Sequence, residues 1–501
     1  MTRTLALAAA LVASLSLAST AAAKPGRAPK PAYEVGIGQR TIAVGADGTY
    51  DGQPVYLGGY GISSPPVTAG RPASGNLGDG PSVRAIVIGD GKHLVAVADA
   101  ELQGWFAASK DGPYGISDVR KAVDQRTKGA LPASSVIVQS DHSHGGPDLL
   151  GVWGGAPAAY RQYVVNQTVD AIVDAYQHRR RGELFYGTAP GRDLLSNQFD
   201  YDPANQAVDS DVRVLQARDD KGRAFATLLN FSAHATVLGS DNKKATGDWP
   251  QAANPLLEQR FGGRAMTMVG TVGRTQPADR GCADKTKTGD ALQLCKLDDY
   301  ATRVVNRAAD AVKSAKAIPG APVVAAESFL VEDPATNPLL LSLLYAGAAA
   351  GAPVNRALAP PYMAGNVIGS VTGSARIGDV LLSSGPGEMY PQIPLKVREL
   401  MPGLRGYMTA GLADDQLGYL IAPYTAYPEP IRRTFFNQRG DQVSPIDNDN
   451  YAFNVSPTMG ERVRCSLLRG AREVLGADVA ADPACAPFAT DAALPAGADV
   501  S

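Results

Sequence analysis

The stretch Val136-Ile137-Val138-Gln139-Ser140-Asp141-His142-Ser143-His144-Gly145-Gly146-Pro147 joins an apolar run to a pair of histidines and a Gly-Gly-Pro turn. The apolar run predicts a strand, and the histidines follow where that strand ends. On an extended chain, residues two apart project from the same face, so His142 and His144 are expected to point together. Neutral imidazole is a common zinc ligand. The chain has only five histidines, and taken alone the triplet fits either a metal site or a pair of loop histidines that cap a strand.

The first residues are typical of a secretory signal peptide. Arg3 supplies a positive charge, residues 5–17 form an apolar core, and Ala21-Ala22-Ala23 offer a small-residue cleavage site. We therefore expect residues 1–23 to be removed, and the protein to be secreted or to lie on the exterior of the cell envelope. A membrane anchor is the weaker alternative, because the apolar core is too short to cross a bilayer.

Charge and cysteine content narrow the expected partners. The formal net charge is −2 over 501 residues and no long basic tract occurs, so nucleic acid is not an expected partner. Four cysteines in an exported chain predict two disulfides. The sequence-local pairing is Cys282 with Cys295 and Cys465 with Cys485, and two other connectivities remain open. A zinc site made of cysteines is less favoured, because none of them forms a Cys-x-x-Cys motif.

Strand and helix patterns alternate along the chain, which predicts a mixed α/β fold of layered sheets flanked by helices. We expect a Pro-rich leader at 24–34, a single large domain at 35–486 because no linker interrupts it, and a disordered tail at 487–501. The expected strands include residues 83–88, 93–98, 135–139, 224–233, 322–332, 376–383 and 404–410. The expected helices include residues 118–127, 158–180, 248–261 and 297–316, with a further buried apolar helix at 339–352.

Three more predicted strands end near a residue that can bind a metal or a substrate: the strand at 224–233 leads into His234, the strand at 376–383 into Glu388, and the strand at 404–410 toward Tyr419. Functional residues often lie on loops that a rigid scaffold holds, so the repeated placement favours a shared site. Taken singly, Glu388 is better explained as a solvated carboxylate in a first helical turn, and Tyr419 as a packed aromatic.

Together, these segments resemble the neutral/alkaline (non-lysosomal) ceramidase family. Ser140–Pro147 is similar to the family's His-Thr-His-Ser-Gly-Pro, Asn230–His234 to its Asn-Phe-x-x-His, Gly385–Glu388 to its Pro-Gly-Glu, and Gly411–Tyr419 to its Gly-Leu…Tyr segment. The order is the same and the spacing is similar. Gly58-Gly59-Tyr60-Gly61 and Val83-Arg84-Ala85 also resemble amino-terminal motifs of the family, so the resemblance covers roughly residues 35–430.

The resemblance implies a single large catalytic domain with a zinc ion held by His142, His234, Glu388 and Tyr419, and with His144 facing the substrate. His144 or the Tyr419 hydroxyl would stabilise the oxyanion and protonate the leaving amine. The implied reaction is hydrolysis of a linear, ceramide-like N-acyl amide through a zinc-bound water, whose pKa zinc lowers to about 7. The expected substrate is a small-molecule or lipid amide, including one presented at a membrane surface, and no obligate protein partner is expected.

Two substrate-facing segments depart from the family pattern. The family's Gly-Asp-x-Ser-Pro-Asn loop corresponds to Gly273–Ala278, where Gln276 stands in place of the serine but can still donate a hydrogen bond. Its Asn-Arg-Ser-Pro segment corresponds to a stretch where Gln198 replaces the substrate-facing arginine. The family's carboxy-terminal immunoglobulin-like domain is not expected in this chain. The alternatives are therefore a zinc hydrolase of a different amide or ester, and a non-catalytic ceramidase-like binding protein.

Overall fold

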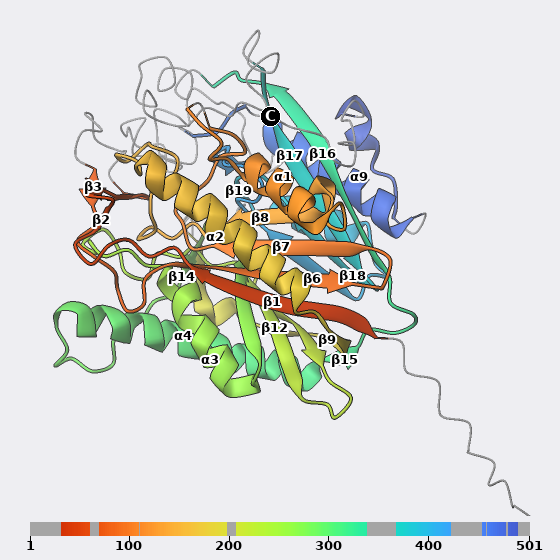
Figure 1. Cartoon of the computed structure of the whole chain (residues 1–501). Helices are drawn as coiled ribbons and strands as arrows, with labels where there is room; N and C mark the ends of the chain where they lie inside the picture. The colour runs from red at the N-terminus through yellow and green to blue at the C-terminus, as the bar shows by residue number, and fades with distance from the viewer. Residues whose placement is uncertain are drawn as a thin grey trace, which may run out of the picture. The chain divides into compact units, whose positions relative to one another are not determined.

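Two mixed β-sheets lie face to face at the centre of the computed structural model. The structure describes residues 32–60, 70–109, 111–197, 207–337, 367–421, 453–456, 458–476 and 479–488. The larger sheet has the strand order β13-β12-β11-β9-β1-β6-β7-β8, with β15 beside β9, and the smaller sheet has the order β16-β17-β18-β20 (Figure 1).

The elements of these layers have the following bounds. The larger sheet contains β1 (Tyr33–Thr41), β6 (Ser82–Gly89), β7 (Leu94–Ala100), β8 (Val136–Ser140), β9 (Arg180–Pro190), β11 (Asp211–Arg218), β12 (Ala224–Phe231), β13 (Arg264–Val269) and β15 (Lys316–Ala317). The smaller sheet contains β16 (Val324–Pro334), β17 (Val367–Ile377), β18 (Val380–Ser384) and β20 (Gly406–Ala410). The helices are α1 (Ile116–Thr127), α2 (Ala158–Gln177), α3 (Asp248–Phe261), α4 (Gly289–Ser314), α6 (Gln392–Glu399) and α9 (Met459–Leu475).

Short two-stranded ladders lie outside the two main sheets. They are β2 (Thr49–Tyr50) with β3 (Gln53–Pro54), β4 (Tyr56–Leu57) with β5 (Arg71–Pro72), β10 (Leu195–Asn197) with β14 (Thr275–Pro277), and β19 (Glu388–Met389) with β21 (Tyr419–Leu420). The last two ladders carry residues of the candidate site.

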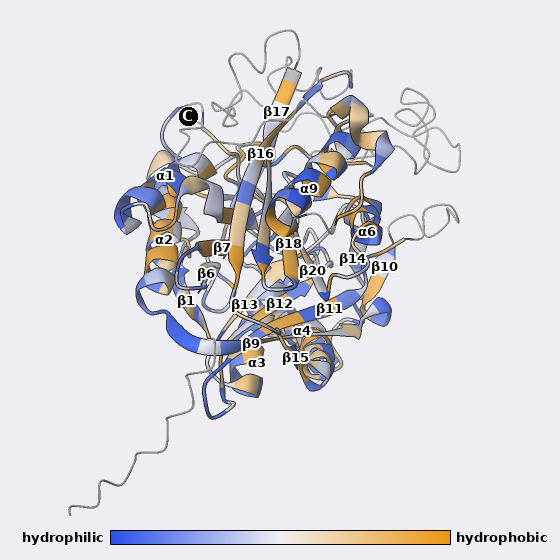
Figure 2. Cartoon of the chain, turned by 90° about the vertical axis from the view of Figure 1, so that its right-hand side faces the viewer, coloured by the Kyte–Doolittle hydropathy of each residue, from blue (hydrophilic) through white to orange (hydrophobic). Residues whose placement is uncertain are grey.

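Alternation of side chains along the strands produces a four-layer arrangement of helices, sheet, sheet and helices. On β6, Ile86 and Ile88 pack in the apolar layer between the two sheets, whereas Ala85 and Val87 pack with residues of α1 and α2. Helices α3 and α4 cover the β11–β13 end of the larger sheet. Helices α6 and α9 cover the outer face of the smaller sheet, where α9 carries both hydrophilic and hydrophobic residues along its length (Figure 2). The predicted fold class is confirmed.

Several predicted element boundaries are wrong: the helix at 297–316 spans Gly289–Ser314 instead, and two other boundaries fail because of tertiary pairing. The helix at 158–180 ends at Gln177, because Arg180 and Arg181 pair with Val35 and Glu34 of β1 and so begin β9. The strand at 376–383 is a hairpin, because Gly378 adopts a left-handed φ of 63° and turns β17 back into β18. In both places tertiary pairing decided the backbone direction.

Both predicted disulfides are confirmed, Cys282–Cys295 and Cys465–Cys485. Several predicted segments lie outside the described residues. They are the helix at 339–352, the signal peptide, most of the leader, and all of the tail except its first two residues. Among the described helices, none combines the length and the apolar character that a membrane span requires.

Removing the Cys465–Cys485 bond is expected to destabilise the protein. The bond closes a loop over a sequence separation of 20 and ties residues 479–488 to α9. A loop of this size restricts the unfolded chain, so the double variant Cys465→Ser/Cys485→Ser should lower the free energy of unfolding by about 3 kcal/mol. Denaturant titration measures this change. An unchanged midpoint and slope would show that the bond adds no stability.

Candidate metal centre

Strand ends from both sheets converge on one cluster of side chains. His142 and His144 follow β8, and His234 follows β12. Glu388 opens β19, a few residues after β18. Each of β8, β12 and β18 belongs to a parallel pair, with β7, β13 and β20 respectively. Side chains at the carboxyl ends of such strands commonly form ligand sites.

The three histidines lie close enough together to share one metal ion. One nitrogen from each of His142, His144 and His234 lies within 4.8 Å of the others. Glu388 joins them, with Oε1 3.3 Å from Nε2 of His142 and Oε2 3.3 Å from Nε2 of His234. His142, His234 and Glu388 are buried, whereas His144 is half-buried. The structure thus brings together the residues that follow β8, β12 and β18.

The backbone around His142 differs from the extended chain that the His-Ser-His spacing suggested. Strand β8 ends at Ser140, and His142 has a φ of 59°, in the left-handed region. The amide of Ser143 donates to the Leu102 carbonyl, and that of His144 donates to the Ala235 carbonyl. The two imidazoles therefore meet across a turn, edge to face, with their centroids 4.9 Å apart.

Backbone carbonyls fix the orientation of two of the imidazoles. Nδ1 of His142 lies 2.7 Å from the carbonyl oxygen of Gln103, and Nδ1 of His234 lies 3.2 Å from that of Thr275. Because a carbonyl only accepts, Nδ1 must carry the proton in both rings. In the neutral imidazoles the lone pair then lies on Nε2, directed at Glu388, which is the arrangement typical of metal-binding histidines.

This arrangement requires positive charge between the rings and the carboxylate. Burial opposes ionisation of Glu388, but His142 and His234 outweigh it and hold the pKa of Glu388 well below its ordinary value. Burial likewise disfavours protonated His142, but Glu388 outweighs it and raises the pKa of His142. Either protons or a cation must therefore separate the lone pairs. A buried set of imidazoles and a carboxylate fits a divalent transition-metal ion.

Tyr419 and Gln276 lie on the short ladders beside this cluster. Tyr419 of β21 is the register partner of Glu388 in the parallel pair β19–β21, so both side chains leave the ladder on the same side. Gln276 of β14 accepts a hydrogen bond on Oε1 from the Thr236 hydroxyl at 2.8 Å, which leaves its amide nitrogen as a donor. Gln198 lies outside the described residues, directly after β10, which pairs with β14.

The sequence did not point to the groups that orient the ligands. The carbonyls of Gln103 and Thr275 act through the backbone, so their side-chain types carry no signal. Arg71 and Tyr60 also contact His144. Tyr60 stood within the Gly-Gly-Tyr-Gly motif, whereas nothing in the sequence singled out Arg71.

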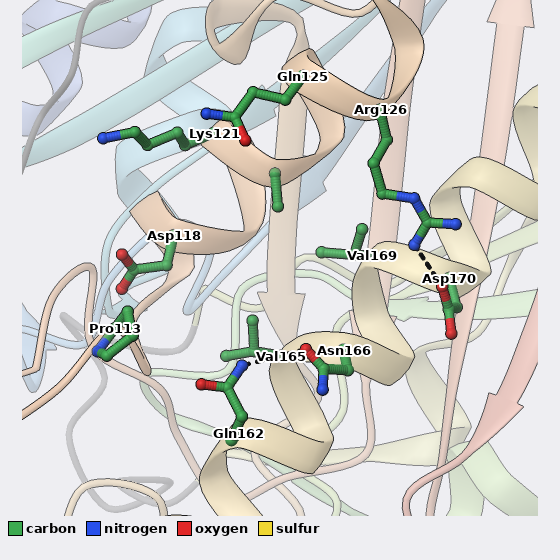
Figure 3. A pocket seen from close by; sticks show the side chains of 11 residues that line it. Pro113, Asp118, Lys121, Gln125, Arg126, Gln162, Val165, Asn166, Val169 and Asp170 are labelled. Atoms are coloured by element: carbon green, nitrogen blue, oxygen red, sulfur yellow. Dashed lines mark hydrogen bonds and ion pairs between the residues drawn. The ribbon is translucent and has the colours of Figure 1, made fainter.

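The remaining features do not belong to the cluster. His93 and His178 are exposed, each beside an aspartate, as expected for turn and helix-end histidines. A surface groove of about 570 Å³ lies between α1 and α2, and none of the site residues lines it (Figure 3). It is lined by Pro113, Asp118, Lys121, Ala122, Gln125, Arg126, Gln162, Val165, Asn166, Val169 and Asp170.

The fold and the cluster together define a layered α/β protein with a buried histidine–carboxylate site that can bind a metal. No protein-family model and no curated protein sequence matches the chain. Solved structures, by contrast, match its fold. Neutral ceramidase from Pseudomonas aeruginosa superposes with a TM-score of 0.63 at 16% identity, over 88% of this chain and 74% of that one. A ceramidase complexed with C2 superposes with a TM-score of 0.64 at 16% identity, over 90% and 77% of the two chains. The chain therefore has the neutral ceramidase fold.

Removing either anchored histidine is expected to abolish metal binding. His142→Ala or His234→Ala deletes one Nε2 of the candidate site and leaves Glu388 without a partner on that side. Each purified variant should lose nearly all bound metal. Inductively coupled plasma mass spectrometry after gel filtration measures the metal content. His178→Ala removes an exposed histidine outside the cluster and should keep the wild-type content. Equal metal content in all three variants would contradict the site.

Proposed function

We propose that this chain is an exported, zinc-dependent amidohydrolase that cleaves the N-acyl bond of a ceramide-like amide. The observation that carries the proposal is the buried convergence of His142, His234 and Glu388, next to His144, on a neutral ceramidase fold. Two disulfides are in keeping with export to an oxidising compartment.

In this proposal His142, His234 and Glu388 hold the metal, and Tyr419 completes the set. The pairing of Tyr419 with Glu388 supports its inclusion, because the two residues leave the same ladder side by side. Bound zinc would lower the pKa of a water molecule to about 7 and polarise the amide carbonyl. The anchored Nδ1 atoms of the two histidines keep their Nε2 atoms aimed at the site before any ligand arrives.

His144 is the residue best placed to move protons. Its ring packs against His142 and His234, with centroids 4.9 and 5.5 Å away. Both of its ring nitrogens lack a hydrogen-bond partner among the described residues, and the side chain is half-buried. His144 can therefore accept a proton from the attacking water and return it to the departing amine, a role worth about 10²–10⁴-fold in rate.

Gln276 would orient the substrate. Because the Thr236 hydroxyl holds Oε1 of Gln276, its amide N–H groups can donate to a carbonyl or hydroxyl of the bound amide. Thr275, the neighbour of Gln276, accepts from both the backbone amide and Nδ1 of His234. Strand β14 thus connects the proposed substrate contact directly to a metal ligand.

Replacing His144 separates proton transfer from metal binding. His144→Ala should keep the wild-type metal content but lower kcat by about 10²–10⁴-fold. Metal analysis and turnover of a short-chain N-acylsphingosine measure the two properties in the same preparation. Loss of metal in this variant would instead make His144 a ligand, and unchanged turnover would remove its catalytic role.

A substrate panel tests the reaction itself. Purified full-length protein loaded with zinc should release fatty acid from N-acylsphingosine, and treatment with a chelator should stop the release until zinc is restored. N-acyl amino acids, lactones and simple esters form the comparison set. Turnover of one of these alone would keep the hydrolase and change the substrate. Zinc binding without turnover of any compound would favour a binding protein.

A further inference from the structure

His144 is held differently from the other two histidines of the cluster. The rings of His142 and His234 are each anchored through Nδ1 on a backbone carbonyl, whereas the ring of His144 makes no hydrogen bond to a described residue. A ring that must exchange protons needs free nitrogens, but it also needs a defined orientation. The orientation of His144 must therefore come from packing and from its backbone.

Arg71 fixes the backbone of His144. Its guanidinium donates from one terminal nitrogen to the carbonyls of His144, at 2.6 Å, and of Gly58. The other terminal nitrogen donates to the Asn242 carbonyl at 2.8 Å. One planar cation thus joins three chain segments at fixed angles. An ammonium group could not hold the same geometry, because its donors are not arranged in a rigid fork.

Tyr60 and Gly59 fix the ring. The Tyr60 ring meets the His144 ring edge to face, with centroids 4.7 Å apart and planes at 76°. The Arg71 guanidinium lies over the face of Tyr60, 4.9 Å from its centroid. Gly59 has a φ of 92°, and a Cβ there would lie 2.4 Å from Cγ of His144, so only glycine admits the ring. His142 closes the remaining side at 4.9 Å.

We propose that Arg71 and Tyr60 are positioning residues that hold the His144 imidazole edge-on to the metal-binding cluster while leaving both of its nitrogens free. The structural claim stands on these contacts alone, and its catalytic consequence rests on the proposed function. Neither residue need touch the substrate. Arg71 acts on the backbone of His144, and Tyr60 acts on the ring.

Histidine NMR tests the positioning directly. Only five histidines occur in the chain, so protein labelled at histidine Cε1 should give five resolvable ring signals. His144→Gln identifies the signal of His144. Arg71→Lys and Tyr60→Leu should each move that signal more than any other histidine signal, with bound metal unchanged. Tyr60→Phe, which keeps the ring, should return it to the wild-type position. Arg126→Lys, on the surface of α1, is the matched control and should change nothing.

Kinetics provide the second measurement. Arg71→Lys and Tyr60→Leu should lower kcat by about 10- to 100-fold and leave KM within about twofold, as expected when a group is displaced by about 1 Å. If both variants leave the His144 signal in place, or lower kcat no more than Arg126→Lys does, the positioning role is wrong. If the wild type hydrolyses no N-acyl amide, the proposed function fails, while the His144 signal still decides the positioning.

Discussion

The structure depends on one buried carboxylate. Glu388 is only 5% exposed, and each of its oxygens faces an imidazole nitrogen at 3.3 Å. Burying a charge without compensation costs several kcal/mol. Because the Nδ1 protons of His142 and His234 are committed to carbonyls, compensation must come from extra protons or from a cation placed among these atoms. A metal ion can contact all three residues at once, whereas a single proton on His142 neutralises the charge but leaves the Nε2 lone pair of His234 facing the second oxygen of Glu388.

The two stacked sheets make this cluster rigid. Gln139 of β8 donates through its amide nitrogen to the carbonyls of Val269, at the end of β13, and of Gly411, directly after β20, both at 2.6 Å. It thereby connects the β8 and β13 edges of the larger sheet with the smaller sheet. Asp414 accepts from the amide of Val138 at 2.9 Å and pairs with buried Arg120 at 2.9 Å. Polar contacts of this kind between the sheets hold the loops after β8 and β20 in place, and so fix the positions of the candidate site residues.

The sequence predicted the strand ends well, because period and composition act locally. The apolar runs before His142 and His234 form strands close to the predicted places, and the ordered motifs indicated the ceramidase-like fold. The failures were at junctions. The local sequence did not predict that the arginines after α2 would pair with β1, or that the chain would reverse at Gly378. Both features depend on which strand pairs with the segment, and the residue pattern of a segment does not specify its partner strand.

By itself the sequence determined which residue types stand at the ends of which strands, and therefore which ligands and bases the site can offer. Only the tertiary structure decided how each is used. His142 turns through a left-handed backbone, the Gln103 and Thr275 carbonyls set the two tautomers, and His144 is left with free nitrogens against Tyr60. The physical reason is that these roles depend on the angle between rings and backbone groups far apart in the chain. The spacing of residues in the sequence predicts which side chains share a face of a strand, but the angle between two side chains depends on how their segments pack.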